Sequence, residues 1–152
     1  MFSLFQKATI IADLDASSKR GALRALADRV AADNDLDVSV CMDHLLAREQ
    51  LGATGVGGGV AMPHGRIEGL KDIAVGFARL KTPVEYEGPD GEPVDLILLL
   101  LAPEEAGAVC LKALSTASRA LRGPAVRGRL RAATDAAAIR TILTESQDSE
   151  AA

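Results

Sequence analysis

Aromatic residues are scarce in this chain of 152 residues: they make up 3% of it, with one tyrosine, Tyr86, and no tryptophan. The core must therefore be built from Leu, Val, Ile and Ala. Few aromatics also leave few platforms on which the bases of single-stranded nucleic acids could stack. The net charge of −4 argues further against a nucleic-acid partner, because a basic surface supplies most of that affinity. We expect no nucleic-acid binding.

Long apolar segments and a secretory signal are lacking as well. The longest uninterrupted apolar run is Leu96–Ala102, which is far too short to span a bilayer. Residues 1–15 do not combine a charged region, a long apolar stretch and a small-residue cleavage site. Cys41 and Cys110 are the only cysteines, so a disulfide framework is not expected. These absences predict a cytoplasmic protein without membrane insertion.

The chain length fits one domain with a buried core, which we expect at residues 1–146, followed by a frayed polar tail at 147–152. The pattern predicts four strands: Ala8–Ala12, Val60–Met62, a half-buried Ile73–Leu80, and a central Val94–Leu101 that is apolar on both faces. The predicted helices run from Ser17 or Ser18 to about Ala32, from Val38 to Gln50, from Pro103 to about Arg122, and near Val126–Ala132 and Asp135–Thr144. This order predicts an α/β (α+β) sandwich with a mixed central sheet flanked by helices.

A glycine-rich loop precedes His64. Six glycines lie in the segment Gly52–Gly65, and Pro63 restricts the backbone immediately before the histidine. A neutral imidazole is nucleophilic near pH 7, and its phosphorylated form can pass the phosphoryl group on. Such transfer needs in-line positioning and donors for the phosphoryl oxygens. The backbone amides of the loop, the Thr54 hydroxyl and the Arg48 guanidinium could supply these donors.

Spacing alone leaves the role of this loop open. A lone histidine beside proline and glycine is more often an ordinary turn residue than a catalytic one. The loop lacks the GxxxxGK[ST] pattern of a Walker A site. It also lacks the following helix and distant acidic residue of a Rossmann fingerprint. Neither nucleotide-binding motif is therefore expected here.

The stretch Arg48–Gly65, REQLGATGVGGGVAMPHG, resembles the signature of the fructose/mannitol-type IIA family of the bacterial phosphotransferase system. In that family an acidic or amide residue, here Glu49, precedes a glycine-rich loop that leads into an aliphatic-Ala-aliphatic-Pro-His-small sequence. The segments ASSKR at 16–20, LKTP at 80–83, GEPVDL at 91–96 and LLAPE at 100–104 resemble the nitrogen-regulatory branch. The resemblance spans roughly residues 3 to 145 and implies a IIA-like fold.

The resemblance implies that an HPr-like carrier transfers a phosphoryl group to Nε2 of His64, with Arg48 and Thr54 stabilising it. Many relatives have a second histidine early in the helix that follows the Ala-Pro-Glu sequence, which is at residues 102–104 here. Cys110 occupies the position of that histidine. A thiol cannot replace a ring that is both base and donor, so we expect a usable but altered site, with slower transfer or a phosphohistidine of different stability. Redox sensing by Cys110 would need a lowered pKa, and a packed thiol is the simpler expectation.

No cofactor is implied, and we expect no metal site. Cys41 and His44 are three residues apart on a predicted helix, and with His64 and Cys110 they make a two-Cys, two-His set. Their spacing matches no zinc template, so we expect Cys41 to pack on the apolar stripe and His44 to lie on the helix surface.

A basic region lies late in the chain, where Asp135 is the only opposing acid among the arginines. Such a region is usually a solvated face, and an acidic partner surface is the alternative. The arginines concerned are Arg119, Arg122, Arg127, Arg129, Arg131 and Arg140.

Three functions stay open. The first is a nitrogen-regulatory protein that binds a sensor kinase, a transporter or a metabolic enzyme according to its phosphorylation state. The second is a sugar-specific IIA component that relays phosphate from HPr to a IIB domain. The third is a binding module that takes no phosphate, which the missing second histidine suggests. The free-standing chain, the lack of a IIB-like cysteine domain and the resemblance of the N-terminal half favour the first.

Overall fold

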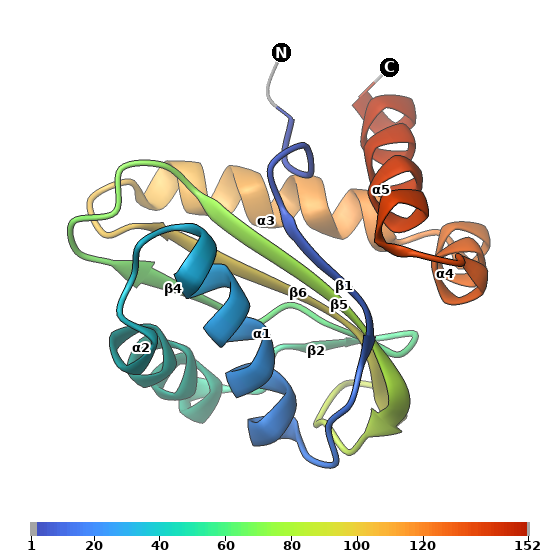
Figure 1. Cartoon of the computed structure of the whole chain (residues 1–152), viewed down its shortest axis with the longest axis horizontal. Coiled ribbons are helices and arrows are strands. Elements are labelled where there is room, and N and C mark those ends of the chain that lie inside the picture. Colours follow the sequence, from blue (N-terminus) through green and yellow to red (C-terminus); the bar gives the residue numbers. More distant parts are fainter. Residues whose placement is uncertain (1–2, 152) are drawn as a thin grey trace.

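In the computed structural model, which describes residues 3–151, a six-stranded mixed sheet is covered by helices on both faces (Figure 1). The strands are β1 (Thr9–Leu14), β2 (Gly55–Gly57), β3 (Val60–Ala61), β4 (His64–Ile67), β5 (Ala74–Val84) and β6 (Val94–Pro103). The helices are α1 (Lys19–Asp33), α2 (Val38–Leu51), α3 (Gly107–Leu121), α4 (Pro124–Ala132) and α5 (Ala136–Ala151). None of these helices is long and apolar enough to cross a membrane. The predicted α/β sandwich is confirmed.

Strand β6 organises the sheet and supports the segment that carries His64. The strand order is β1-β5-β6-β3-β2, and β4 also pairs with β6. β5 runs antiparallel to β6, whereas β3 and β4 follow one another in parallel along its other edge. Between them the Pro63 carbonyl accepts a hydrogen bond of 3.0 Å from the Leu100 amide. The two short strands therefore act as one broken strand, and the break places His64 opposite Leu100.

The two faces of β6 lie in two separate apolar cores. Leu96, Leu98 and Leu100 pack in the core beneath α3 and α5, and Ile97 and Leu99 pack in the core beneath α1 and α2. All five side chains are fully buried. Helices on both sides of the strand explain why its sequence is a continuous apolar run. The predicted central strand is confirmed.

Strand β5 is buried on both faces over its first half, where the sequence predicted a half-buried strand. Helix α1 lies so close that a Cβ at Gly76 would be 2.4 Å from Cγ2 of Val30. The small residues Ala74, Gly76 and Ala78 make room for this helix and do not face solvent. The half-buried prediction is therefore wrong, because small residues can mark a closely packed face as well as an open one.

Several boundaries of strands and helices differ from the prediction, because pairing within the sheet decides them and local sequence signals do not show that pairing. β2 lies in the segment predicted as a glycine-rich loop, and β4 was not predicted as a strand, because four residues or fewer are too few to show a strand period. Strand β6 continues through Pro103, residues 104–105 form a turn, and α3 begins only at Gly107. The proline and the two acidic residues after it therefore precede the helix that they were expected to open.

Helix α5 continues to Ala151, where the sequence predicted a frayed tail from residue 147. Gln147 is buried, and its Oε1 accepts a hydrogen bond of 3.0 Å from the Leu4 amide. This contact between the two ends of the chain orders the segment despite its polar composition. Ala152, the last residue of the predicted tail, lies outside the described residues.

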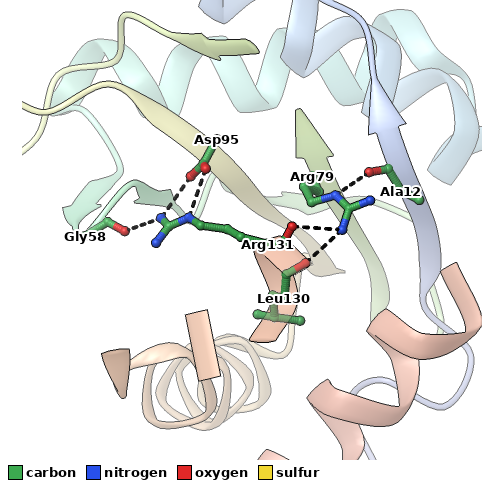
Figure 2. A network of polar contacts seen from close by, with 6 residues as sticks. All are labelled: Ala12, Gly58, Arg79, Asp95, Leu130 and Arg131. Carbon is green, nitrogen blue, oxygen red and sulfur yellow. Dashed lines mark hydrogen bonds and ion pairs between the residues drawn. The ribbon is translucent and has the colours of Figure 1, made fainter. Parts of the chain in front are cut away.

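Arginine side chains hold the end of α4 against the sheet (Figure 2). Arg131 donates to both carboxylate oxygens of Asp95 on β6, each at 2.9 Å, and to the Gly58 carbonyl at 2.7 Å. Arg79 of β5 donates to the Ala12 carbonyl at 2.8 Å and to carbonyls at the C-terminal end of α4. Arg131 is exposed, as expected of a solvated face, but its guanidinium is also bonded within the molecule.

Candidate functional site

His64 lies in a cleft of about 780 Å³ between α2 and α3. β4, which pairs with β6, lines the cleft between these two helices. Both apolar and basic side chains line the cleft. The lining residues are His44, Ala47, Arg48, Gln50 and Leu51 of α2, His64, Gly65 and Arg66 of β4, and Gly107, Cys110, Leu111 and Leu114 of α3.

The two ring nitrogens of His64 have different partners. Nδ1 lies 3.0 Å from the Met62 carbonyl oxygen, and Nε2 lies 3.3 Å from Nε of Arg48. A carbonyl only accepts hydrogen bonds, so Nδ1 carries the ring proton. A guanidinium only donates, so Nε2 presents its lone pair. The two contacts thus assign the proton of the half-buried ring to Nδ1 and its lone pair to Nε2, which accepts from Arg48 and can act as a nucleophile once Arg48 moves aside.

Arg48 connects the end of α2 to this imidazole. Its Nη1 donates to the Gly52 carbonyl at 2.7 Å while its Nε donates to His64. Carbonyls at a helix C-terminus have no intrahelical partner, so this bond also stabilises the end of α2. The planar guanidinium can make both bonds at once because its donors form a rigid fork. The structure therefore brings together Arg48 and His64, and the role of Arg48 in stabilising a phosphoryl group stays a prediction.

Thr54 lies outside the cleft. It is buried, its hydroxyl donates to the Glu49 carboxylate, and the same oxygen lies 2.9 Å from the Tyr86 hydroxyl. Thr54 is absent from the residues that line the cleft around His64. The predicted direct contact of this hydroxyl with phosphoryl oxygens does not fit the geometry, because two buried groups already occupy it.

A buried polar cluster surrounds Thr54. Nζ of Lys19 lies 2.9 Å from Oε1 of Glu49 and 4.4 Å from the centroid of the Tyr86 ring. Burial raises the pKa of Glu49, but hydrogen bonds from Thr54 and Lys19 outweigh it, and the pKa lies below its ordinary value. Burial raises the pKa of Tyr86 above its ordinary value. At neutral pH the cluster therefore contains an ionised Glu49 and a protonated Tyr86.

The glycine-rich hairpin between β2 and β3 is not part of the cleft. Gly57, Gly58 and Gly59 have φ values of 92°, 67° and 79°, which glycine adopts without the strain that other residues suffer. The Gly58 amide donates to the Asp90 carboxylate at 2.9 Å. These three glycines line hollows on the α4 side of the molecule. The expected backbone cradle for phosphoryl oxygens is therefore not formed by them.

Two basic side chains of the cleft were not predicted from the sequence as site residues. Arg66 was not identified at all, and His44 was expected only on the helix surface. Arg66 follows His64 by two residues on β4, and a Cβ at Gly107 would lie 3.4 Å from its Nη1. His44 is exposed, as predicted, but it also lines the cleft one helical turn before Arg48. The i,i+4 spacing of His44 and Arg48 was a usable signal. No comparable signal identified Arg66, because β4 was not recognised as a strand.

The two cysteines lie in different cores. Cys110 is buried on the wall of the cleft, and burial raises its pKa, although Arg66 opposes this shift. Cys41 packs beneath α1 and α2, and burial raises its pKa too. Neither cysteine forms a disulfide. Between residues 3 and 151, no three His, Cys, Asp or Glu residues are grouped so that they could hold a metal ion.

Comparison with known proteins places this site in a family. Residues 3–146 match the family described as the phosphoenolpyruvate-dependent sugar phosphotransferase system, EIIA 2. The nitrogen regulatory protein of Bradyrhizobium diazoefficiens is 46% identical over 134 residues, which cover 88% of each chain. The crystal structure of nitrogen regulatory protein IIA-Ntr from Neisseria meningitidis aligns with a TM-score of 0.85 and 36% identity, covering 91% of this chain and 94% of that one.

A more distant structure shares the fold. The complex of enzyme IIAMTL and phosphorylated enzyme IIBMTL from Escherichia coli aligns with a TM-score of 0.77 at 19% identity, covering 95% of this chain and 99% of that one. The family match extends over nearly the whole described chain, and the relatives match over most of their own length. The chain therefore belongs to the EIIA type-2 family of phosphotransfer components, in which its relatives include nitrogen regulatory proteins.

Proposed function

We propose that this protein accepts a phosphoryl group on Nε2 of His64 from an HPr-like phosphocarrier protein and regulates target proteins according to its phosphorylation state. The main support is the pair of contacts to Met62 and Arg48, which places the proton on Nδ1 and the lone pair on Nε2, in a cleft where Arg48 can move from Nε2 to an arriving phosphoryl group. Membership of a phosphotransfer family supports the same chemistry. In this role the protein is a phosphotransferase with a phosphohistidine intermediate.

The transfer needs no general base on this chain. The lone pair on Nε2 attacks phosphorus while the bond between phosphorus and the carrier's nucleophile breaks, and the carrier keeps that electron pair. Nδ1 keeps its proton and its hydrogen bond to the Met62 carbonyl throughout. The same tautomer can then release the phosphoryl group to a further acceptor by the reverse movement of electrons. The protein contributes position and electrostatic stabilisation.

Two arginines supply positive charge near the transferred group. Arg48 already donates to Nε2 in the unphosphorylated ring, so a small movement brings its guanidinium onto a phosphoryl oxygen. Arg66 lines the same cleft. Charge-assisted donors of this kind are strongest where the transition state spreads negative charge over the equatorial oxygens. We propose Arg48 as the principal phosphoryl-stabilising residue.

The surface around the cleft supports a protein as the phosphoryl donor. Leu51 of α2 and Leu111 of α3 line the cleft and are 85% and 70% exposed. Large apolar side chains with so much exposure on the two sides of a reactive group are typical of a docking surface. The apolar walls would contact the carrier, and the basic residues would meet the phosphoryl group.

A regulatory role is favoured over sugar transport. The relative from Bradyrhizobium diazoefficiens carries the name nitrogen regulatory protein and matches over 88% of both chains. The regulated partner would be a sensor kinase, a transporter or a metabolic enzyme. Two unpaired cysteines suit a reducing compartment, so we propose a cytoplasmic location. Pull-down with the phosphorylated and free forms tests this choice: a IIB domain as the only phosphorylation-dependent partner would favour sugar transport instead.

The phosphoryl acceptor is tested by incubating the protein with phosphoenolpyruvate, enzyme I and an HPr-like carrier. Intact mass should reveal one acid-labile, base-stable phosphoryl group on the wild type. The chain has two histidines, so His44→Ala is the matched control for His64→Ala. The adduct should disappear in the His64 variant and persist in the His44 variant. No adduct on the wild type would leave a binding module as the function, and an adduct on His64→Ala would refute the assignment.

A further inference from the structure

A chain of hydrogen bonds joins Thr54 to the imidazole of His64. The Met62 amide donates to the Thr54 carbonyl at 2.9 Å, and the Met62 carbonyl lies 3.0 Å from Nδ1 of His64. Met62 is therefore held by Thr54 at its amide and holds the histidine ring at its carbonyl. A shift of the Thr54 backbone would move the acceptor that decides which ring nitrogen carries the proton.

The same threonine is fixed to the helix end that carries Arg48. Glu49, the next residue of α2, accepts a hydrogen bond of 3.1 Å from the Thr54 amide and a second from the Thr54 hydroxyl. The amide of Gly52 donates to the Glu49 carbonyl at 3.2 Å, which closes α2. These bonds hold the turn after α2 against the helix. Thr54 thereby fixes the strand segment of His64 relative to Arg48.

The directions of the hydrogen bonds in the buried cluster are determined. The single hydroxyl proton of Thr54 goes to Glu49, so the Tyr86 hydroxyl must donate to the Thr54 oxygen, 2.9 Å away. Lys19 approaches the other oxygen of the same carboxylate at 2.9 Å. Throughout the described part of the chain, every buried side-chain nitrogen and oxygen has a hydrogen-bond partner. A satisfied buried network of this kind favours one geometry over its alternatives.

We propose that Thr54, held by Glu49, Lys19 and Tyr86, is a positioning residue that sets the tautomer of His64 and its alignment with Arg48. The inference rests on the proposed phosphoryl transfer at His64, but it concerns the ring before any phosphoryl group arrives. The Thr54 hydroxyl forms hydrogen bonds with Glu49 and Tyr86 and not with the phosphoryl oxygens. The cluster joins the start of α1, the end of α2 and the segment after β5, so three elements contribute to the orientation of one ring.

The test compares three threonine variants. Thr54→Val removes the hydroxyl at nearly constant volume, Thr54→Ser keeps it, and Thr82→Val removes a hydroxyl from an exposed position of β5 as the matched control. Nitrogen NMR of the unphosphorylated protein reports the tautomer of His64. Transfer from the carrier gives kcat and KM separately. If Thr54→Val does not fold, Tyr86→Phe removes the other hydroxyl of the pair and is measured in its place.

The proposal predicts a specific combination of results. Thr54→Val should show a mixture of the two His64 tautomers and a kcat reduced roughly 10- to 100-fold at unchanged KM, since supporting partners of this kind typically matter to that degree. Tyr86→Phe should shift both quantities in the same direction, and Thr54→Ser and Thr82→Val should match the wild type. A wild-type tautomer in Thr54→Val overturns the proposal. If kcat is lowered although the tautomer is that of the wild type, Thr54 is a direct phosphoryl ligand. If both kcat and the tautomer are unchanged, Thr54 is a purely structural residue.

Failure of this inference is distinguishable from failure of the proposed function. If the wild type accepts no phosphoryl group from the carrier, phosphoryl transfer at His64 is wrong. The tautomer comparison needs no carrier and still decides whether Thr54 positions the ring.

Discussion

At the scale of single residues, the reactivity of His64 depends on one acceptor and one donor. The Met62 carbonyl accepts a hydrogen bond from Nδ1, and the Arg48 guanidinium donates to Nε2. Met62 lies two residues before His64, and Arg48 lies near the end of α2, which lines the same cleft. The two contacts therefore assign the ring proton to Nδ1 and the lone pair to Nε2.

Replacement of Arg48 tests the electrostatic part of this account. Arg48→Gln should lower the transfer rate by about 100-fold, the usual effect of removing one transition-state donor. Arg48→Lys should recover part of the rate, because an ammonium keeps the charge but cannot bond to His64 and Gly52 as a fork. Rapid-quench measurement of phosphoryl transfer gives both values. A glutamine variant as fast as the wild type would show that the guanidinium has no part in transfer.

Cys110 gives a second residue-scale prediction. Burial raises its pKa, so the thiol stays protonated at neutral pH, and only the thiolate is nucleophilic. In a Cys41→Ala background, Cys110 should react slowly with an aromatic disulfide reagent near pH 7. The rate should rise as the pH is brought above the ordinary range for a thiol, and denaturant should abolish the protection. Rapid reaction of the folded protein at neutral pH would indicate a redox-sensitive thiol instead.

At the scale of elements, the site depends on how closely α2 approaches β4. A Cβ at Gly65 would lie 3.2 Å from Cβ of His44, tighter than most real contacts of this kind. Helix α2 carries Arg48 one turn beyond His44, so any displacement of the helix changes the contact between Arg48 and His64. The glycine after the histidine therefore matters through packing.

Gly65→Ala should separate this packing effect from general destabilisation. The methyl group should cost about 1 kcal/mol of stability by overpacking and reduce the transfer rate by displacing Arg48 from His64. Gly128→Ala is the matched control, because nothing lies within 4 Å of a Cβ there. That helical substitution should be neutral or stabilising by up to about 1 kcal/mol. Urea unfolding and transfer kinetics of both variants check the prediction, and equal rates would contradict it.

The same elements show where sequence reasoning succeeded and where it could not. Ser18 caps α1 through a local bond to the Gly21 amide, and β6 reads as a continuous apolar run, so both were predictable. β4 is four residues long and is defined by its pairing with β6, which no local pattern reveals. The position of Thr54 depends on Tyr86, 32 residues away, and for that reason its orientation was missed.

At the scale of the whole molecule, polar links fasten the helical layers to the sheet. Arg131 joins α4 to Asp95 of β6 and to the hairpin at Gly58 (Figure 2). This hairpin leads directly into β3 and then His64. The link therefore holds the start of the β3–β4 segment in place. The cluster around Thr54 holds Met62, between these two strands.

A double-mutant cycle measures the strength of this link. Asp95→Asn and Arg131→Gln should be coupled by about 1 kcal/mol, because the pair is bidentate and partly shielded from solvent. The Arg24–Asp28 pair lies on the surface of α1 with both side chains about half exposed, and its coupling should be only a few tenths of a kcal/mol. Urea unfolding gives the four free energies of each cycle. Equal coupling in the two pairs would contradict the proposed fastening.

Acid should weaken the folded state through Glu49. Its folded pKa lies below the unfolded value because Thr54 and Lys19 stabilise the carboxylate against the cost of burial. Its contribution to stability is therefore complete above the unfolded pKa, about 4.3, and is lost as the pH falls through the lower folded value. Glu49→Gln should flatten the decline of the free energy of unfolding in this acidic range. A variant with the same acid dependence as the wild type would show that Glu49 does not carry this effect.

The central claim is that Nε2 of His64 is the phosphoryl acceptor. Nitrogen and phosphorus NMR of the protein phosphorylated by its carrier identify the bonded atom directly. Phosphorus should be bonded to Nε2 of His64 while Nδ1 keeps its proton toward the Met62 carbonyl. Phosphorus on Nδ1 of His64, or on a ring nitrogen of His44, would contradict it.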